Sequence, residues 1–176
     1  MLIFWWITLS KFNFNKLQPG DILLFRTTKN SPFHDKLISF GEKLSGEKMT
    51  KHSYHHVAMV GNDGNVLEAI WKGTVCHPYE DVDLTGFIEV YRVKGATKQQ
   101  AQEAITWAIE NLGEKYDLVG LFLSWAGLHE RHAQICCTYV GNAWEAAGVQ
   151  LTVKKNEKIY SPDDIAANKK VLKRVF

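Results

Sequence analysis

One turn signal between two apolar runs constrains the fold of this chain more than any other feature. Asn62-Asp63-Gly64 separates the runs His56–Gly61 and Asn65–Trp71. Asn, Asp and Gly tolerate the positive φ angles that a tight hairpin turn requires. The sequence therefore predicts two antiparallel strands that are joined at this turn.

Further strands are expected on both sides of the hairpin. The Pro19-Gly20-Asp21 turn leads into the apolar run Ile22–Phe25, and Phe87–Val93 alternates apolar with polar residues as a half-buried strand does. A short strand is expected at Val75–Tyr79, and the apolar residues 1–9 are interpreted as an edge strand. The β portion is expected to end near residue 93.

Helices are expected mainly in the second half of the chain. Thr97 and Gln100 have the spacing of a capping box, and an apolar stripe with helical spacing follows them up to Gly113. Four other helices are predicted: Phe33–Leu44, Tyr116–Leu128, Cys137–Ala147 and a short one capped by Ser161. Because strands precede helices, we expect one α+β domain over residues 1–176, with helices packed on an antiparallel sheet or barrel.

The composition excludes some classes of function. Lys and Arg number 21 against 19 Asp and Glu, and the net charge of +2 is too small for the broad basic surface of a nucleic-acid-binding protein. Nucleic acid is therefore not an expected partner. Three cysteines do not make a disulfide scaffold, so a free and reactive thiol is expected instead.

The apolar N-terminus bears on location. Residues 1–9 are shorter than the roughly 20 residues of a membrane-spanning helix, and no basic segment or small-residue cleavage site marks a secretory signal. We expect a cytoplasmic protein. The alternative is association with a membrane surface or the cell envelope, through the Trp-rich start and the basic tail from Lys154 onward.

Cysteine, histidine and glutamate occur where a thiol nucleophile needs them. Cys136 and Cys137 precede a helical stretch, and the unpaired N–H groups of a first helical turn favour a thiolate. His55 and His56 open the first hairpin strand, and Glu68 lies on its partner strand, within reach of an imidazole. A Cys–His–Glu arrangement is predicted, although alternation along the strand leaves open which of the two histidines faces inward.

Six short motifs, in this order, resemble a known superfamily. They are Pro19-Gly20-Asp21-Ile22-Leu23-Leu24-Phe25, His56-Val57-Ala58-Met59-Val60, Val66-Leu67-Glu68-Ala69, Tyr116-Asp117, Cys137-Thr138 and Ser161-Pro162-Asp163-Asp164. Together they resemble the permuted papain-like NlpC-type cysteine amidases and peptidases, in particular the YiiX/YaeF-like branch, over about residues 17–168. In that superfamily the strand with the histidine precedes the helix with the cysteine, which is the order found in this chain.

The resemblance implies an enzyme that needs neither cofactor nor metal. Cys137 matches the nucleophile, His56 the general base and Glu68 the residue that orients it. The implied reaction is cleavage of an amide bond in a peptide or peptidoglycan fragment through an acyl-enzyme. The alternatives are hydrolysis or transfer of an acyl-lipid group, and an inactive binding module. The chain departs from the family pattern by having Cys136 before the nucleophile, and Thr138 and Tyr139 where Ser and Glu are common.

The remaining cysteines and histidines are expected to have structural roles. Cys76 and Cys136 are predicted to pack in the core, and His55 to flank the site. Loop or surface positions are predicted for His34, His52, His77, His129 and His132. A zinc site is a weaker interpretation of these residues, because the ligand spacing of structural zinc sites is not repeated in the chain.

Overall fold

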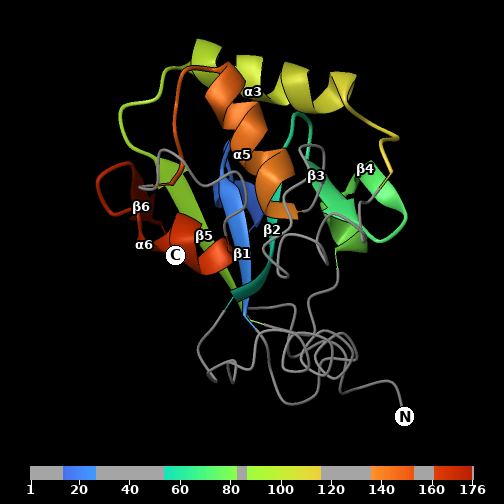
Figure 1. Ribbon diagram of the computed structural model, residues 1–176, viewed down its shortest axis with the longest axis horizontal. Coiled ribbons are helices and arrows are strands. Elements are labelled where there is room, and N and C mark those ends of the chain that lie inside the picture. The colour runs from blue at the N-terminus through green and yellow to red at the C-terminus, as the bar shows by residue number, and fades with distance from the viewer. Residues whose placement is uncertain (1–13, 27–53, 83–86, 116–135, 153–160, 176) are drawn as a thin grey trace, which may run out of the picture.

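The computed structural model describes residues 14–26, 54–82, 87–115, 136–152 and 161–175. Its elements are, in chain order, η1 (Phe14–Lys16), β1 (Ile22–Arg26), β2 (Tyr54–Val60), β3 (Asn65–Ile70), β4 (Gly73–Pro78), η2 (Tyr79–Asp81), β5 (Phe87–Val93), α3 (Lys98–Glu110), α5 (Cys136–Ala146), α6 (Pro162–Ala167) and β6 (Leu172–Arg174). The strands form one antiparallel sheet in the order β4-β3-β2-β1-β5-β6 (Figure 1). The described part of the chain is therefore α+β, as the sequence predicted.

The predicted hairpin joins β2 to β3. Asp63 and Gly64 have φ angles of 54° and 75°, which their residue types tolerate. The N–H of Gly61 donates to the carbonyl of Asn65 over 2.8 Å and closes the turn. The hairpin prediction is confirmed.

The Pro-Gly-Asp turn leads into β1 as expected. Gly20 has a φ angle of 86°, and a Cβ at this position would lie 2.9 Å from the ring of Trp144 on α5, so a side chain would be both strained and crowded. Asp21 is buried, and its carboxylate accepts two hydrogen bonds of 2.7 Å from Arg92 of β5. This bidentate pair fixes the start of β1 against its neighbouring strand.

The sheet extends one strand further than the sequence predicted. The β portion was expected to end near Val93, but β6 pairs with β5 through Leu172 opposite Val93 and Arg174 opposite Tyr91. This strand has three residues, of which Lys173 and Arg174 are exposed. It is too short for the apolar alternation by which a strand is recognised in a sequence, which needs about four residues or more.

The caps of two helices agree with the sequence. In α3 the N–H of Gln100 donates to Oγ1 of Thr97, and the Gln100 side chain accepts from the Thr97 N–H, both over 3.1 Å. In α6 the Ser161 side chain accepts from the N–H of Asp164 over 3.2 Å. These bonds satisfy N–H groups that have no partner inside the helix.

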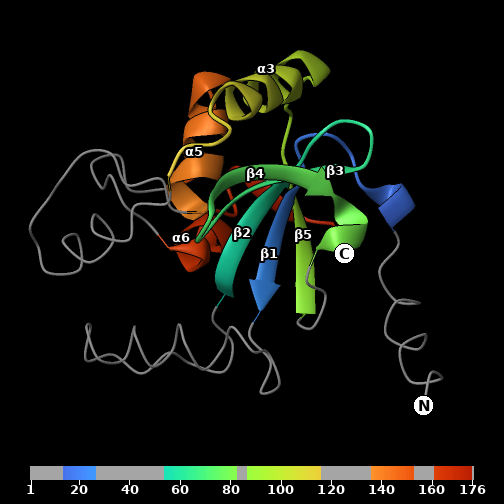
Figure 2. The same ribbon diagram turned by 90° about the vertical axis from the view of Figure 1, so that its right-hand side faces the viewer.

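Each face of the sheet carries an apolar cluster. On one face Leu24, Met59 and Leu67 pack with residues of α3, α5 and α6. Leu23 and Val90 belong to the cluster on the other face. Figure 2 shows α5 and α6 on the same side of the sheet. Because α5 also contacts β2, β3 and α3, packing along its length fixes where its first residues lie.

Three expected elements lie outside the described residues: the strand at residues 1–9 and the helices Phe33–Leu44 and Tyr116–Leu128. Within the ranges that the structure describes, no helix is long and apolar enough to cross a membrane.

Candidate active site

Three ionisable side chains from neighbouring strands meet at the sheet. His56 of β2, Glu68 of β3 and His77 of β4 occupy positions that alternation assigns to one face. Nε2 of His56 lies 2.6 Å from Oε2 of Glu68, and Nε2 of His77 lies 2.7 Å from Oε1 of the same carboxylate. Alternation left open whether His55 or His56 faces the site, and the structure shows that His56 does. Glu68 binds two imidazoles.

Strands β2 and β3 part close to this cluster. They pair at only two positions, both next to the turn: Met59 with Leu67 and Val60 with Val66. The earlier part of β2 is therefore not paired with β3. The first residue of α5 lies at this edge, where the thiol of Cys136 is close to the backbone N–H of Val57 and to the ring of His56.

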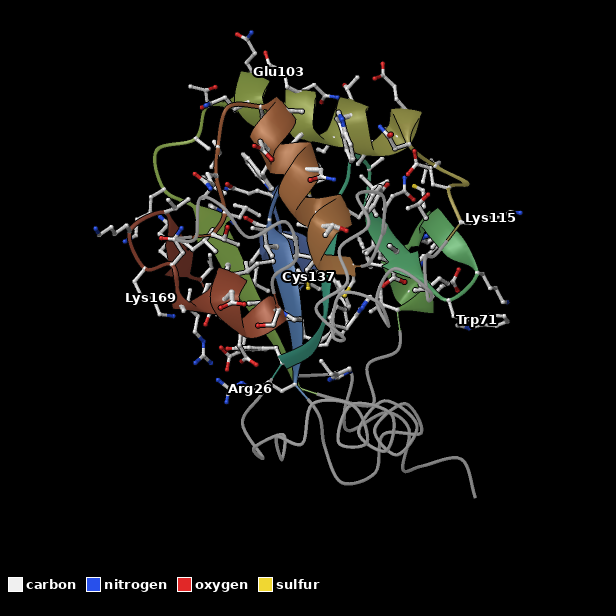
Figure 3. The ribbon with its side chains drawn as sticks, viewed as in Figure 1. Arg26, Trp71, Glu103, Lys115, Cys137 and Lys169 are labelled. Atoms are coloured by element: carbon white, nitrogen blue, oxygen red, sulfur yellow. The ribbon has the colours of Figure 1, made fainter. Side chains whose placement is uncertain are left out.

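The two cysteines of α5 are both buried, and their Sγ atoms lie 3.8 Å apart. Successive side chains of a helix point about 100° apart, so the cysteines have different neighbours. Cys136 lies against His56, whereas the charges of Asp163 and Asp164 on α6 act on Cys137. Figure 3 shows Cys137 at the lower end of α5.

The electrostatics favour a thiolate on Cys136 and a protonated His56. The hydrogen bond from Cys137 lowers the pKa of Cys136 most, burial opposes it, and His56 lowers it further, so that this pKa lies well below its ordinary value. Burial alone would lower the pKa of His56, but Cys136 and Glu68 outweigh burial and raise it to about 10. Each charged form is therefore stabilised by an opposite charge in contact with it.

The pKa values of Glu68 and Cys137, the two groups next to this pair, agree with a charged Cys136 and a charged His56. Burial raises the pKa of Glu68, but hydrogen bonds from His56 and His77 outweigh it and hold the pKa below its ordinary value. Burial raises the pKa of Cys137, and the contact with Cys136 raises it further. Cys137 thus remains a thiol that donates its S–H to Cys136.

The ring of Phe25 packs beside the site. It lies 5.2 Å from the ring of His56, at an angle of 50°.

The structure brings together two of the three predicted site residues, and the third lies beside them. His56 and Glu68 are in contact, as the predicted arrangement requires. The predicted nucleophile, Cys137, is next to the site, but Cys136 is the thiol that contacts His56. Cys136 was expected only to pack in the core, and it is buried as expected. This placement has a physical reason, because the rotation of α5 about its axis decides which of two adjacent thiols meets the imidazole.

Two other expectations are corrected on β4. His77 was expected in a loop or on the surface, but its side chain is only 20% exposed and contacts Glu68. Cys76 was expected in the core and is exposed. The signal that sequence reasoning missed is the short turn before Gly73, since a tight β3–β4 hairpin places His77 diagonally opposite Glu68. The other histidines for which loop or surface positions were predicted, His34, His52, His129 and His132, lie outside the described residues.

The zinc-site interpretation gains no support from the part of the chain that the structure describes. There, no group of three or more His, Cys, Asp or Glu side chains could hold a metal ion.

No family model matches the chain, and no curated protein matches it in sequence. The site is therefore interpreted from its own geometry.

Proposed function

We propose that this protein is a thiol-dependent hydrolase of the permuted papain-like type, with Cys136 as nucleophile, His56 as general base and Glu68 as the residue that orients it. One observation carries the proposal: Cys136 lies against His56, whose Nε2 is 2.6 Å from Glu68, and this arrangement lowers the pKa of Cys136 and raises that of His56. This is the charge distribution of an activated thiolate–imidazolium pair. The order of the elements supports the permuted type, because β2, which carries His56, precedes α5, which carries Cys136.

The reaction begins with attack of the Cys136 thiolate on the carbonyl carbon of an amide. The negative charge that develops on the carbonyl oxygen is stabilised by backbone N–H groups at the start of α5. His56 gives its proton to the leaving nitrogen, the C–N bond breaks, and the acyl group remains on Cys136 as a thioester.

Water then completes the cycle. His56, now neutral, takes a proton from a water molecule whose oxygen attacks the thioester carbon. The C–S bond breaks, the carboxylic acid leaves, and the thiolate and imidazolium are restored. Glu68 holds Nε2 of His56, so Nδ1 is the ring nitrogen left for these proton transfers. The S–H of Cys137 stabilises the thiolate at the start and the end of the cycle.

We propose an amide bond in a peptide or peptidoglycan fragment as the bond that is cleaved. An acyl-lipid substrate would pass through the same thioester, so the two substrate classes are arms of one assay. Purified wild-type protein is incubated with peptidoglycan-derived peptides and with acyl lipids, alongside Cys136→Ala and Cys137→Ala. We expect peptide cleavage that falls at least about 1000-fold in Cys136→Ala and less than about tenfold in Cys137→Ala.

Alkylation tests the nucleophile without any knowledge of the substrate. In a Cys76→Ala background, which removes the exposed thiol, reaction with iodoacetamide is followed by mass spectrometry at pH 7. We expect fast modification in wild type and Cys137→Ala, and slow modification in Cys136→Ala and His56→Ala. Equally slow reaction of all four proteins would indicate an inactive binding module and overturn the proposal. Loss of fast reaction in Cys137→Ala alone would restore the assignment made from sequence.

A further inference from the structure

Glu68 is held through both of its oxygens, and His77 supplies the second contact. Nε2 of His77 lies 2.7 Å from Oε1 of Glu68, and its Nδ1 lies 3.0 Å from the carbonyl oxygen of Pro78. A carboxylate oxygen and a carbonyl oxygen are both hydrogen-bond acceptors, so each ring nitrogen of His77 faces an acceptor. His77 is itself held at one nitrogen while it binds Glu68 with the other.

The register of β3 and β4 places this second imidazole. His77 opposes Val66, and Val75 opposes Glu68, so His77 and Glu68 are diagonal neighbours on one face of the pair. Long side chains on such positions are within reach of each other. The position of His77 therefore follows from backbone pairing and not from a mobile surface contact.

The second contact has a consequence for His56. The terminal torsion of a glutamate side chain is broad, so a carboxylate that is bound through one oxygen can still rotate. The side chain of Glu68 is 12% exposed, so water has little access to a free oxygen there. Binding of Oε1 by His77 removes this rotation and keeps Oε2 directed at His56.

We propose that His77 is a positioning residue of this site: by binding the second oxygen of Glu68, it fixes the carboxylate that orients His56. The importance of His77 for hydrolysis rests on the proposed function. Its effect on the thiolate of Cys136 does not, because that thiolate is measured directly.

Several ionisable groups act on one another in this cluster, and they come from β2, β3, β4, α5 and α6. They are His56, Glu68, His77, Cys136, Cys137, Asp163 and Asp164. Only substitutions that differ in the donor at position 77 isolate the contribution of His77 from those of the other groups.

The pH dependence of Cys136 alkylation is the readout, in a Cys76→Ala background. His77→Phe removes the donor, His77→Asn has a side chain too short to reach Oε1, and His77→Gln places an amide N–H near the position of Nε2. We expect the pH midpoint of the rise in alkylation rate to move up by roughly 0.5–1 unit in His77→Phe and His77→Asn, and to return to the wild-type value in His77→Gln.

Thermal melting of each variant separates positioning from a merely structural role. Lower melting temperatures with an unmoved midpoint in both His77→Phe and His77→Asn would overturn the proposal. If His77→Phe does not fold, His77→Asn and His77→Gln still give the comparison. A midpoint in His77→Gln that matches His77→Asn would also overturn it, because the donor would then have no effect.

A double-mutant cycle tests whether His77 acts through Glu68. In a Glu68→Gln background we expect His77→Asn to cause no further shift, whereas an additive shift would overturn the assignment. The two proposals also fail separately. A shifted midpoint without cleavage of any acyl substrate supports His77 as a positioning residue and rejects the hydrolase. Cleavage with an unmoved midpoint rejects only the role of His77.

Discussion

Two buried carboxylates, Glu68 and Glu89, lie in the same sheet but have different kinds of partner. Glu89 of β5 is 4% exposed, and its Oε1 lies 2.9 Å from Nε of Arg26. Tyr54 donates to Glu89 over 2.5 Å and Tyr91 over 3.2 Å. Burial raises the pKa of Tyr91, and the hydrogen bond with Tyr54 raises the pKa of Arg26. Arg26 and Tyr91 therefore keep their protons across the neutral range.

Glu68 is bound instead by two histidines, one of which contacts a thiol. Imidazole is the side chain whose ordinary pKa lies nearest to neutral pH, so it can give and take a proton during a reaction. The difference teaches that burial and hydrogen bonding alone do not identify a catalytic carboxylate. The chemistry of the partner distinguishes the two carboxylates: arginine and tyrosine hold Glu89 in place, whereas His56 connects Glu68 to the buried thiol of Cys136.

The largest effect is expected on catalysis. His56→Ala should reduce kcat/KM for amide cleavage by about 10²–10⁴, because it removes the proposed general base. Arg26→Ala, the matched change beside Glu89, should leave the activity of the folded protein within a few-fold of wild type. Steady-state kinetics on both variants check this. Equal losses of kcat/KM in the two variants would contradict the comparison between the clusters.

Stability should respond in the opposite order. Glu89→Gln leaves Arg26 without its carboxylate, and we expect a loss of about 2–4 kcal/mol in the free energy of unfolding, below the usual range for a fully buried pair because Arg26 is partly exposed. Glu68→Gln should cost less, about 1–2 kcal/mol, because its partner His56, unlike Arg26, can become neutral. Urea unfolding at pH 7 measures both, and a larger loss in Glu68→Gln would contradict the comparison.

The pH dependence of stability should separate the clusters. The pKa of His56 is raised from 6.5 to about 10, so its contribution is fully present below pH 6.5 and is lost as the pH rises through about 10. The pKa of Glu68 is lowered, so its contribution is lost as the pH falls through that lowered value. The stability difference between wild type and Glu68→Gln should thus shrink towards both ends of the pH range.

The raised pKa of Arg26 keeps its charge over this range. The difference in the free energy of unfolding between wild type and Glu89→Gln should therefore persist through pH 10. Unfolding curves at several pH values give both stability differences. If both differences shrink equally at alkaline pH, His56 is not the group whose titration causes the change.

A smaller effect is expected from Cys137. The S–H of Cys137 lowers the pKa of Cys136, so Cys137→Ala should raise the pH midpoint of Cys136 alkylation by roughly 0.5–1 unit. Cys137→Ser keeps a donor and should stay close to wild type. A serine variant that behaves like the alanine variant would show that the donated hydrogen bond is not the cause.

The smallest effect is expected at the rim of the Glu89 cluster. Arg174 lies 3.4 Å from Glu89, but its side chain is 56% exposed. Arg174→Ala should therefore change the free energy of unfolding by about 0–1 kcal/mol. Thermal melting measures this, and a larger loss would mean that Glu89 depends on both of its arginines.

Local patterns predicted most of the elements that carry the site. The Asn62-Asp63-Gly64 turn specified the β2–β3 hairpin, and the Thr97 cap specified the start of α3, because turn and cap preferences act over three or four residues. The strand positions of His56 and Glu68 followed from that hairpin. β6 and the role of His77 were not predicted, because the first depends on pairing with β5, and the second on the register of β4.

The sequence by itself determined that two adjacent thiols, an imidazole and a carboxylate would lie on a helix and a paired set of strands. Only the tertiary structure decided which thiol meets the imidazole. Cys136 shares a helical stripe with Val140 and Ala143, and Cys137 shares one with Trp144, and all of these residues are buried. Apolar spacing therefore did not fix the rotation of α5. The packing of the whole helix on β2, β3 and α3 fixed it, and a helix turned by about 100° would have exchanged the two thiols.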